Sequence, residues 1–400
     1  MSLFSRVQQA PPDAILGLTE QFKADANPRK VNLGVGVYQD SSGKLPLLRC
    51  VEAAEHALAE KPSPKGYQAI DGMPAYNDDV KELVFGAGSP VLASGRVVTI
   101  QALGGTGALK VGADFLRPVN PDAKVLISNP SWENHQALFT RAGFTVEKYR
   151  YYDAEAKGVD VDGMVADLEA APAGTIVVLH ACCHNPTGYD LSASDWQRVI
   201  DAVKAGGLTA FLDMAYQGFA DGIDEDGRVV RTFADQVESF LVSTSFSKSF
   251  SLYGERVGAL SLVCADADEA TRVLSQVKIA IRTNYSNPPT HGAALVETVL
   301  GDAELRAQWV AELGEMRDRI KAMRTALVEG LAAAGVEADM SYITDQVGMF
   351  SFSGLNKAQM VRLRNEFGVY GTDTGRICVA ALNDGNVGYV SESIAAVLKG

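Results

Sequence analysis

The stretch 240-FLVSTSFSKSFSLYGERVGALSLV-263 joins two apolar runs through a short polar loop. FLVSTSF and VGALSLV have the composition of buried strands. Between them Lys248 lies among hydroxyl and aromatic residues, and Arg256 follows it by eight positions. Because lysines are mostly surface residues, one placed directly after a buried strand, with an arginine so close, indicates a special environment.

The same kind of apolar run alternates with helical patterns from about residue 97 to 245. The strand-like runs are VVTIQ, KVLIS, TIVVLH, TAFLD and FLVSTSF, and segments such as GTGALKVGADFL and SDWQRVIDAVKAGG lie between them. This alternation predicts an α/β fold with a mostly parallel sheet and helices on both faces. Polar residues follow several of the strands, in GGTG, NPSW, HNPTG, DMAY and SFSK. Since ligands of such sheets bind beyond the carboxyl ends of the strands, we expect the functional site there.

The pattern changes after about residue 302. Apolar residues then recur every three or four positions after a candidate cap, Asp302, which predicts one long helix over about 302–335. The segments beyond it, GMFSFSG, KAQMVRLRNEFG, GRICVAAL and VGYVSESIAAVL, predict a smaller α/β unit of strand, helix, strand and helix. We expect a large domain over 46–312 and a small domain built from both termini, 1–45 and 313–400, bridged by the long helix.

The composition is that of a globular protein without a polyanionic partner. The chain has 400 residues, 47% of them hydrophobic, and a formal net charge of -13. This acidic balance argues against nucleic acid or an anionic membrane surface as a partner. Neither a signal-peptide pattern nor an apolar run of about 18 residues is present, so we expect a cytoplasmic protein. The five cysteines lack framework spacing, and we expect no structural disulfide.

Two motifs, and the absence of a third, bear on which other classes of site this chain could contain. GGTGALKVG (104–112) follows a predicted strand and opens a predicted helix, whose free amides could hold a phosphate. A plain tight turn explains the motif equally well. The motif is neither a dinucleotide-binding fingerprint nor a P-loop. His180, Cys182 and His184 alternate along the chain, but the ligand gaps and the second ligand pair of a structural zinc site are absent, so we expect no metal. No GxSxG elbow of a serine hydrolase occurs.

Two strand ends carry residues that suit one cofactor. Asp213 ends an apolar strand, and a partly buried carboxylate needs a cationic partner. A lysine in a partly buried cleft, such as Lys248, can form a Schiff base. Ser245 and Ser247 supply hydroxyl donors, and Arg256 supplies a fork suited to phosphate. An aldehyde on lysine, a pyridine nitrogen on aspartate and a phosphate at a helix start describe pyridoxal 5'-phosphate.

The motifs GGTGAL, PSWENH, HACCHNPTG, LDMAYQGF, SFSKSFSLYGERVG, RTNYSNPP and GRICVAAL occur in this order along the chain. Together they resemble the class I (fold type I) aminotransferases, in the subgroup of aspartate and aromatic amino-acid aminotransferases, over nearly the whole chain. The resemblance implies a transaminase that uses pyridoxal 5'-phosphate. It would move the amino group between aromatic or acidic amino acids and 2-oxoglutarate by a ping-pong Schiff-base mechanism.

The resemblance also implies a role for each matching residue. Lys248 would carry the cofactor and move the substrate proton, Asp213 would keep the pyridine nitrogen protonated, and Tyr216 would donate to the phenolic oxygen. His135 and His180 would support Asp213. The implied cofactor-binding residues are Lys248, Gly105, Thr106, Trp132, Asn185, Asp213, Tyr216, Ser245, Arg256 and Tyr67. The implied substrate-binding residues are Gly36, Trp132, Asn185, Arg282 and Arg376. Tyr67 and Arg282 would come from the neighbouring subunit, which implies a homodimer with shared active sites.

The substrate preference stays open between two interpretations. Arg282 favours a dicarboxylic amino acid, and Asn287, Thr106 and Val37 resemble the aspartate enzymes, whereas SFSK, FSLYGERVG, CCHNPTG and the apolar Leu45 favour aromatic substrates. We expect dual specificity, with an aspartate aminotransferase of little aromatic activity as the alternative. A decarboxylase or carbon-sulfur lyase of the same fold would have little use for two substrate arginines. A regulatory module with a dead site would carry a DNA-binding segment and a basic patch, and neither appears in this acidic sequence.

Overall fold

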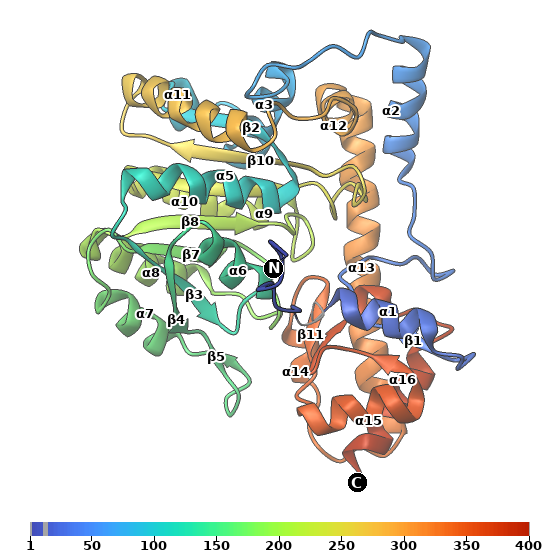
Figure 1. The fold of residues 1–400 in the computed structure, drawn as a ribbon. Helices are drawn as coiled ribbons and strands as arrows, with labels where there is room; N and C mark the ends of the chain where they lie inside the picture. The colour runs from blue at the N-terminus through green and yellow to red at the C-terminus, as the bar shows by residue number, and fades with distance from the viewer. Residues whose placement is uncertain (1, 11–14, 400) are drawn as a thin grey trace.

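A seven-stranded sheet forms the centre of the computed structural model, which describes residues 2–10 and 15–399. The strand order is β2-β10-β9-β8-β7-β3-β4. Only β10 runs antiparallel to its neighbours; the other pairs are parallel, so the predicted mostly parallel sheet is confirmed (Figure 1). The strands are β2 (Val97–Leu103), β3 (Lys124–Asn129), β4 (Thr145–Arg150), β7 (Ile176–His180), β8 (Thr209–Met214), β9 (Phe240–Ser245) and β10 (Val257–Val263).

Helices cover both faces of this sheet because successive strand residues point to opposite sides. On β2, Ile100 belongs to one hydrophobic core and Val97 to the other. The first core includes α5 (Gly104–Val119), α6 (Glu133–Arg141) and α11 (Ala267–Asn284). The second includes α3 (Pro74–Phe85), α7 (Val161–Glu169), α8 (Ala193–Gly206), α10 (Arg228–Gln236) and α12 (His291–Gly301), and it continues into the rest of the chain.

The long helix predicted over about 302–335 is α13 (Ala303–Ala333). Its cap is the predicted one, since the Asp302 carboxylate accepts from the amides of Glu304 and Leu305. The Trp309 indole donates to the carbonyl of Ser249 (2.7 Å), which fastens the first part of the helix to the loop that contains Lys248. The last part lies beside the smaller group of strands and helices (Figure 1).

That smaller unit combines segments from both ends of the chain. β1 (Val31–Asn32) pairs in parallel with β12 (Val369–Tyr370), and β11 (Phe350–Phe352) pairs antiparallel with β13 (Arg376–Cys378). Around them lie α1 (Leu16–Ala24), α14 (Tyr342–Asp345), α15 (Lys357–Phe367), the 3-10 turn η1 (Val379–Ala381) and α16 (Val387–Leu398). The predicted strand-helix-strand-helix order is confirmed here. The limits of the two domains stay a prediction, and residues 1, 11–14 and 400 of the predicted small domain lie outside the described residues.

The remaining elements are α2 (Arg49–Glu60), α4 (Pro90–Ala93), β5 (Tyr152–Asp153), β6 (Gly158–Val159) and α9 (Ile223–Asp226). Within the described ranges, no helix combines the length and apolar character that a bilayer span requires. The five cysteines are all free and buried.

Candidate active site

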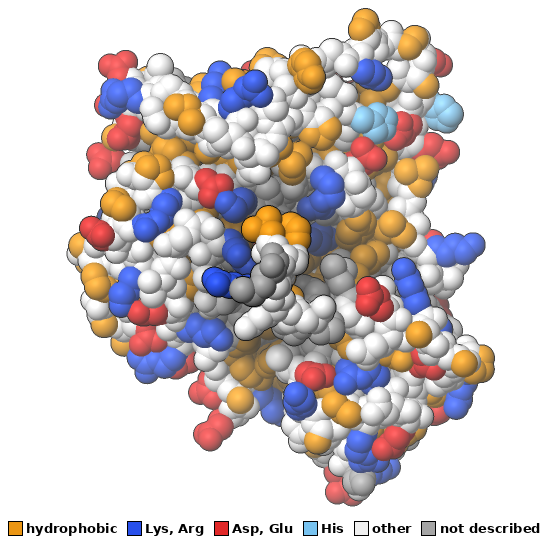
Figure 2. All heavy atoms as spheres, in the orientation of Figure 1, with side chains coloured by type: hydrophobic (Ala, Val, Ile, Leu, Met, Phe, Trp, Pro, Cys, Tyr) orange, Lys and Arg blue, Asp and Glu red, His pale blue; other side chains and the backbone are white. Residues whose placement is uncertain are grey.

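The strands β7, β8 and β9 end at one cavity, which holds about 780 Å³ of empty space including its open mouth. This volume is typical of small-molecule sites. Basic side chains lie around the centre of the face seen in Figure 2, although the whole chain is acidic. The residues predicted for the site that line the cavity are Gly36, Gly105, Thr106, Trp132, Asn185, Asp213, Tyr216, Ser245, Lys248, Arg256 and Arg376.

Lys248 lies three residues after the end of β9 at Ser245, and its amine lies over the Tyr216 ring, 5.0 Å from the ring centroid. Burial lowers the pKa of Lys248 to about 8; the Asp213 carboxylate opposes this, whereas the charges of Arg256 and Arg376 add to it. No carboxylate among the described residues comes within 4 Å of this amine. A lysine amine that is partly neutral near pH 8 can act as a nucleophile or a base.

Asp213 lies near the end of β8 and is buried, with 7% of its surface exposed. Burial raises the pKa of this carboxyl, but the hydrogen bond from His135 Nε2 (2.8 Å) and nearby positive charges outweigh it, so that the net pKa is lowered. Ser131 Oγ lies 2.9 Å from His135 Nδ1 and 3.3 Å from His180 Nε2. The arrangement keeps an ionised carboxylate beside the cavity, ready to hold a cationic group.

The two histidines expected to support Asp213 differ in how they reach it. His135 contacts the carboxylate directly, whereas His180 is connected through Ser131 and His135. Burial lowers the pKa of His180 to about 3, so this imidazole is neutral near pH 7. His184 is also buried, between Ser128 Oγ (2.9 Å) and Thr187 Oγ1 (2.8 Å).

Arg376 on β13 is a buried guanidinium with 1% of its surface exposed. Nη1 donates to Asn185 Oδ1 (3.1 Å), Nη2 donates to the Gly34 carbonyl (2.7 Å), and Nε has no hydrogen-bond partner. In the part of the chain that the structure describes, no acidic side chain pairs with it. A buried cation without an anion is costly, so the geometry fits a ligand carboxylate.

Phe350 is a cavity residue that the sequence did not reveal. Its ring lies 4.3 Å from the Arg376 guanidinium and packs edge-on against Tyr216. A Cβ on Gly36 would lie 2.5 Å from Phe350 Cζ, so only glycine fits beside the ring. The GMFSFSG pattern predicted the strand but gave no signal for this contact, which joins residues distant in sequence.

The opposite end of the cavity contains an anion-binding arrangement. α5 begins at Gly104 without a side-chain cap, so its first amides are free. Arg256 Nη2 lies 2.7 Å from where a Cβ of Gly104 would be, and Nη1 donates to Ser247 Oγ (3.3 Å). Arg256 has no acidic partner among the described residues. A helix N-terminus, a guanidinium and the hydroxyls of Ser245 and Ser247 face a common space, which fits a phosphate group.

Tyr67 and Arg282 do not line this cavity. They border a separate surface pocket together with Ile70, Ser286 and Asn287, and 95% of the Tyr67 surface is exposed. Leu45, expected near the entrance, is 48% exposed and also lies outside the cavity lining. One chain therefore does not bring Tyr67 or Arg282 to its own site.

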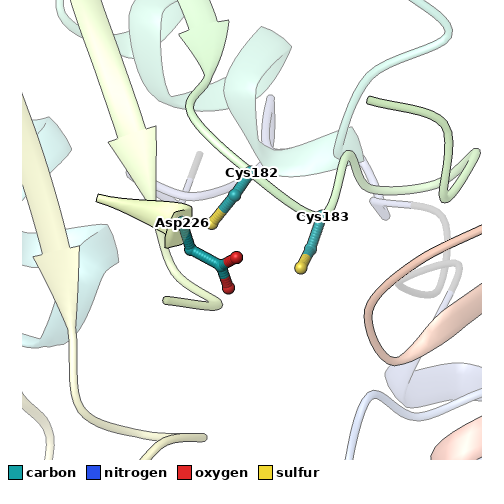
Figure 3. A group of neighbouring side chains, drawn as sticks. All are labelled: Cys182, Cys183 and Asp226. Atoms are coloured by element: carbon teal, nitrogen blue, oxygen red, sulfur yellow. The ribbon is translucent and has the colours of Figure 1, made fainter. Parts of the chain in front are cut away.

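Cys182, Cys183 and Asp226 form a buried cluster whose sulfur and carboxylate atoms face one another (Figure 3). His180, Cys182 and His184 do not alternate along one strand, because β7 ends at His180. Asp226 already accepts from the backbone amides of Gly218, Ala220, Asp221 and Gly222. These bonds occupy both carboxylate oxygens, so the cluster is explained as a loop cap without a metal.

The fold and the site define an α/β enzyme with a lysine, a buried carboxylate and an anion-binding arrangement around one cavity. The chain belongs to the family of class I and II aminotransferases, whose model matches residues 28–394. It is 61% identical over 398 residues to an aspartate aminotransferase of Pseudomonas aeruginosa, and 49% identical over 397 residues to an aromatic-amino-acid aminotransferase of Escherichia coli. These alignments cover 99–100% of this chain and all of each relative.

A solved structure shows the same fold. The aromatic-amino-acid aminotransferase of Burkholderia pseudomallei, covalently bound to pyridoxal phosphate, is 62% identical with a TM-score of 0.97, and the match covers 100% of both chains. The protein is therefore an aminotransferase, and its relatives include enzymes named for aspartate and for aromatic amino acids.

Proposed function

We propose that this protein is a pyridoxal 5'-phosphate-dependent transaminase acting on aromatic and acidic amino acids, with 2-oxoglutarate as the acceptor. One observation carries the proposal: a buried lysine, a buried ionised carboxylate and a buried guanidinium, which has no acidic partner among the described residues, converge on a single cavity. Its relatives' names support the two substrate classes.

The residues present fit the cofactor at both of its ends. The α5 N-terminus, Ser245 and Arg256 would hold the phosphate, and Lys248 would bind the aldehyde. Asp213, kept ionised by His135, would hold the protonated ring nitrogen. When bound, the cofactor supplies an electron sink that makes the α-proton of an amino acid acidic.

The remaining chemistry depends on side chains of this chain. Arg376, positioned by Asn185 and Gly34, would bind the α-carboxylate and so orient the α-carbon. The Lys248 amine, once free, would take the α-proton and return it on the product side. Trp132 and Tyr216 would enclose the ring and keep water from the reacting atoms.

The side-chain subsite decides between the dual-specificity proposal and its alternative, an aspartate enzyme with little aromatic activity. Arg282 has an exposed guanidinium whose bond is to Ser286 Oγ, so it is free to meet a carboxylate from outside its own chain. We propose that Arg282 and Tyr67 complete the cavity of a second copy, which makes the active form a homodimer. The chain would act in the cytoplasm, without nucleic acid or membrane.

The test begins with purified protein and added pyridoxal 5'-phosphate. Wild type should show the visible absorbance of lysine-bound cofactor and should transfer amino groups from aspartate, tyrosine and phenylalanine to 2-oxoglutarate. Lys248→Ala should lose the covalent link and nearly all transfer, while the exposed Lys65→Ala serves as the control. Normal turnover by Lys248→Ala would refute the assignment, and activity with aspartate alone would leave the alternative.

A further inference from the structure

Tyr253 lies in the loop between β9 and β10 and bonds groups on two sides of the cavity. Its backbone carbonyl accepts from Arg256 Nη1 (3.1 Å), and its hydroxyl accepts from the backbone amide of Tyr38 (3.0 Å). Tyr38 follows Gly36 by two residues. One residue therefore connects the guanidinium that faces α5 with the segment that forms the other wall of the cavity.

The segment 33–39 has few fixed points toward the sheet. Among the described residues, its other hydrogen bonds join it to itself, to Asn32, to residues 370–380 or to Arg319 on α13. Among the described residues, the bond from Tyr38 to Tyr253 is the hydrogen bond that ties this segment to the loop carrying Lys248. A change in the position of Tyr253 is therefore passed on to Tyr38 and Gly36.

The bond is partly buried, because Tyr38 is buried and Tyr253 is half-buried. Tyr38 has 5% of its surface exposed, and burial raises the pKa of Tyr253, so its hydroxyl stays protonated. A buried amide that loses its partner costs more than the bond itself contributes. The two residues should therefore move together.

We propose that Tyr253 is a positioning residue that couples occupancy of the phosphate end of the cavity to carboxylate affinity at the other end. The inference rests on the proposed function, because it takes a phosphate between α5 and Arg256 and a carboxylate on Arg376. An anion at the first place fixes Arg256, Arg256 holds the Tyr253 carbonyl, and the Tyr253 hydroxyl holds Tyr38 and hence Gly36. The coupling is reciprocal, since each ligand changes the affinity of the other by the same factor.

Succinate is a suitable carboxylate probe because it has no amino group to transfer. Its Kd is measured by calorimetry on the full chain loaded with pyridoxal 5'-phosphate and on the chain loaded with pyridoxal, which lacks the phosphate. In wild type the phosphate should tighten succinate binding by at least about fivefold, the lower end of usual couplings. In Tyr253→Phe the ratio of the two Kd values should fall to about one. Tyr149→Phe, which removes a hydroxyl bonded to the Val178 carbonyl (3.0 Å), should keep the wild-type ratio.

Hydrogen exchange gives a second readout that does not depend on catalysis. In the cofactor-free chain, the amide of Tyr38 should exchange about five- to tenfold faster in Tyr253→Phe, the factor expected for one lost hydrogen bond. Unchanged exchange, a wild-type ratio near one, or a variant ratio equal to wild type would overturn the inference and leave the proposed function standing. If wild type binds neither pyridoxal 5'-phosphate nor succinate, the proposed function fails and this inference fails with it.

Discussion

Replacing Arg376 by lysine tests the carboxylate subsite most directly. The guanidinium has five N–H groups; Asn185 and Gly34 take two of them, and Nε is among those left free. A substrate carboxylate can therefore accept two parallel bonds from Arg376. A lysine keeps the charge but has a single nitrogen, so it cannot serve Asn185, Gly34 and both carboxylate oxygens together.

The expected loss follows from the bond that disappears. One charge-assisted hydrogen bond contributes about 1.5–3 kcal/mol, which is about a 10- to 150-fold change because each 1.4 kcal/mol is tenfold. kcat/KM should fall by that factor for aspartate, tyrosine and phenylalanine alike, since all three carry the α-carboxylate. Arg282→Leu is the matched control, because it should lower kcat/KM for aspartate and spare the aromatic substrates.

Single half-reactions provide the assay. Each amino acid is mixed with loaded enzyme in the absence of a 2-oxo acid, and the change in cofactor absorbance gives the rate, so that effects on the acceptor do not enter. The absorbance before mixing checks that Arg376→Lys still holds its cofactor. A change of less than threefold for all three substrates, or a loss confined to aspartate, would refute the role of Arg376.

Three further predictions concern the lysine, the aspartate and the glycine wall. The rate at which cofactor-free protein captures pyridoxal 5'-phosphate should rise with pH up to about 8 and then level off. The reason is that the protonated Lys248 amine is not a nucleophile and that burial lowers its pKa to about 8. Stopped-flow absorbance measures this rate, and a rise that continues to pH 10 would contradict the prediction. Asp213→Asn should lower kcat/KM by about tenfold or more, because a buried charge is lost. In wild type, His135 and nearby charges outweigh burial and lower the pKa of Asp213, so protonation of this carboxylate should cost no activity at any pH above its ordinary pKa of about 4. A pH profile of kcat/KM for the two proteins tests both expectations. Gly36→Ala should raise KM by about 5- to 150-fold, because the new methyl group would overlap the Phe350 ring and overpacking costs about 1–3 kcal/mol. An unchanged KM in steady-state assays would show that the ring moves aside freely.

Local patterns were enough for much of the fold and for one side of the cavity. The strands near Asp213 and Lys248 are continuous apolar runs because they are buried on both faces, and such runs are visible in a sequence. The carboxyl ends of parallel strands meet at one edge, so residues placed there by sequence do lie together. The edge strand β4 has mostly exposed side chains, which is why it gave no such signal.

Other features depend on contacts between distant segments. Nothing near Phe350 in the sequence indicates that its ring packs on Arg376 and excludes a side chain at Gly36. The alternation of His180, Cys182 and His184 assumed one continuous strand, whereas the chain leaves the strand at His180.

The sequence by itself determined the fold class, the long helix and the family, because strand runs, helical periodicity and ordered motifs are local properties of the chain. The tertiary structure decided how the site is arranged: which histidine holds Asp213, what faces Arg376, and how Tyr253 reaches Tyr38. It also left Tyr67 and Arg282 outside the cavity of their own chain. The physical reason is that buried polar groups must be hydrogen-bonded, and their partners often come from segments that are distant in the sequence and become neighbours only when the chain folds. Local sequence patterns do not specify such contacts.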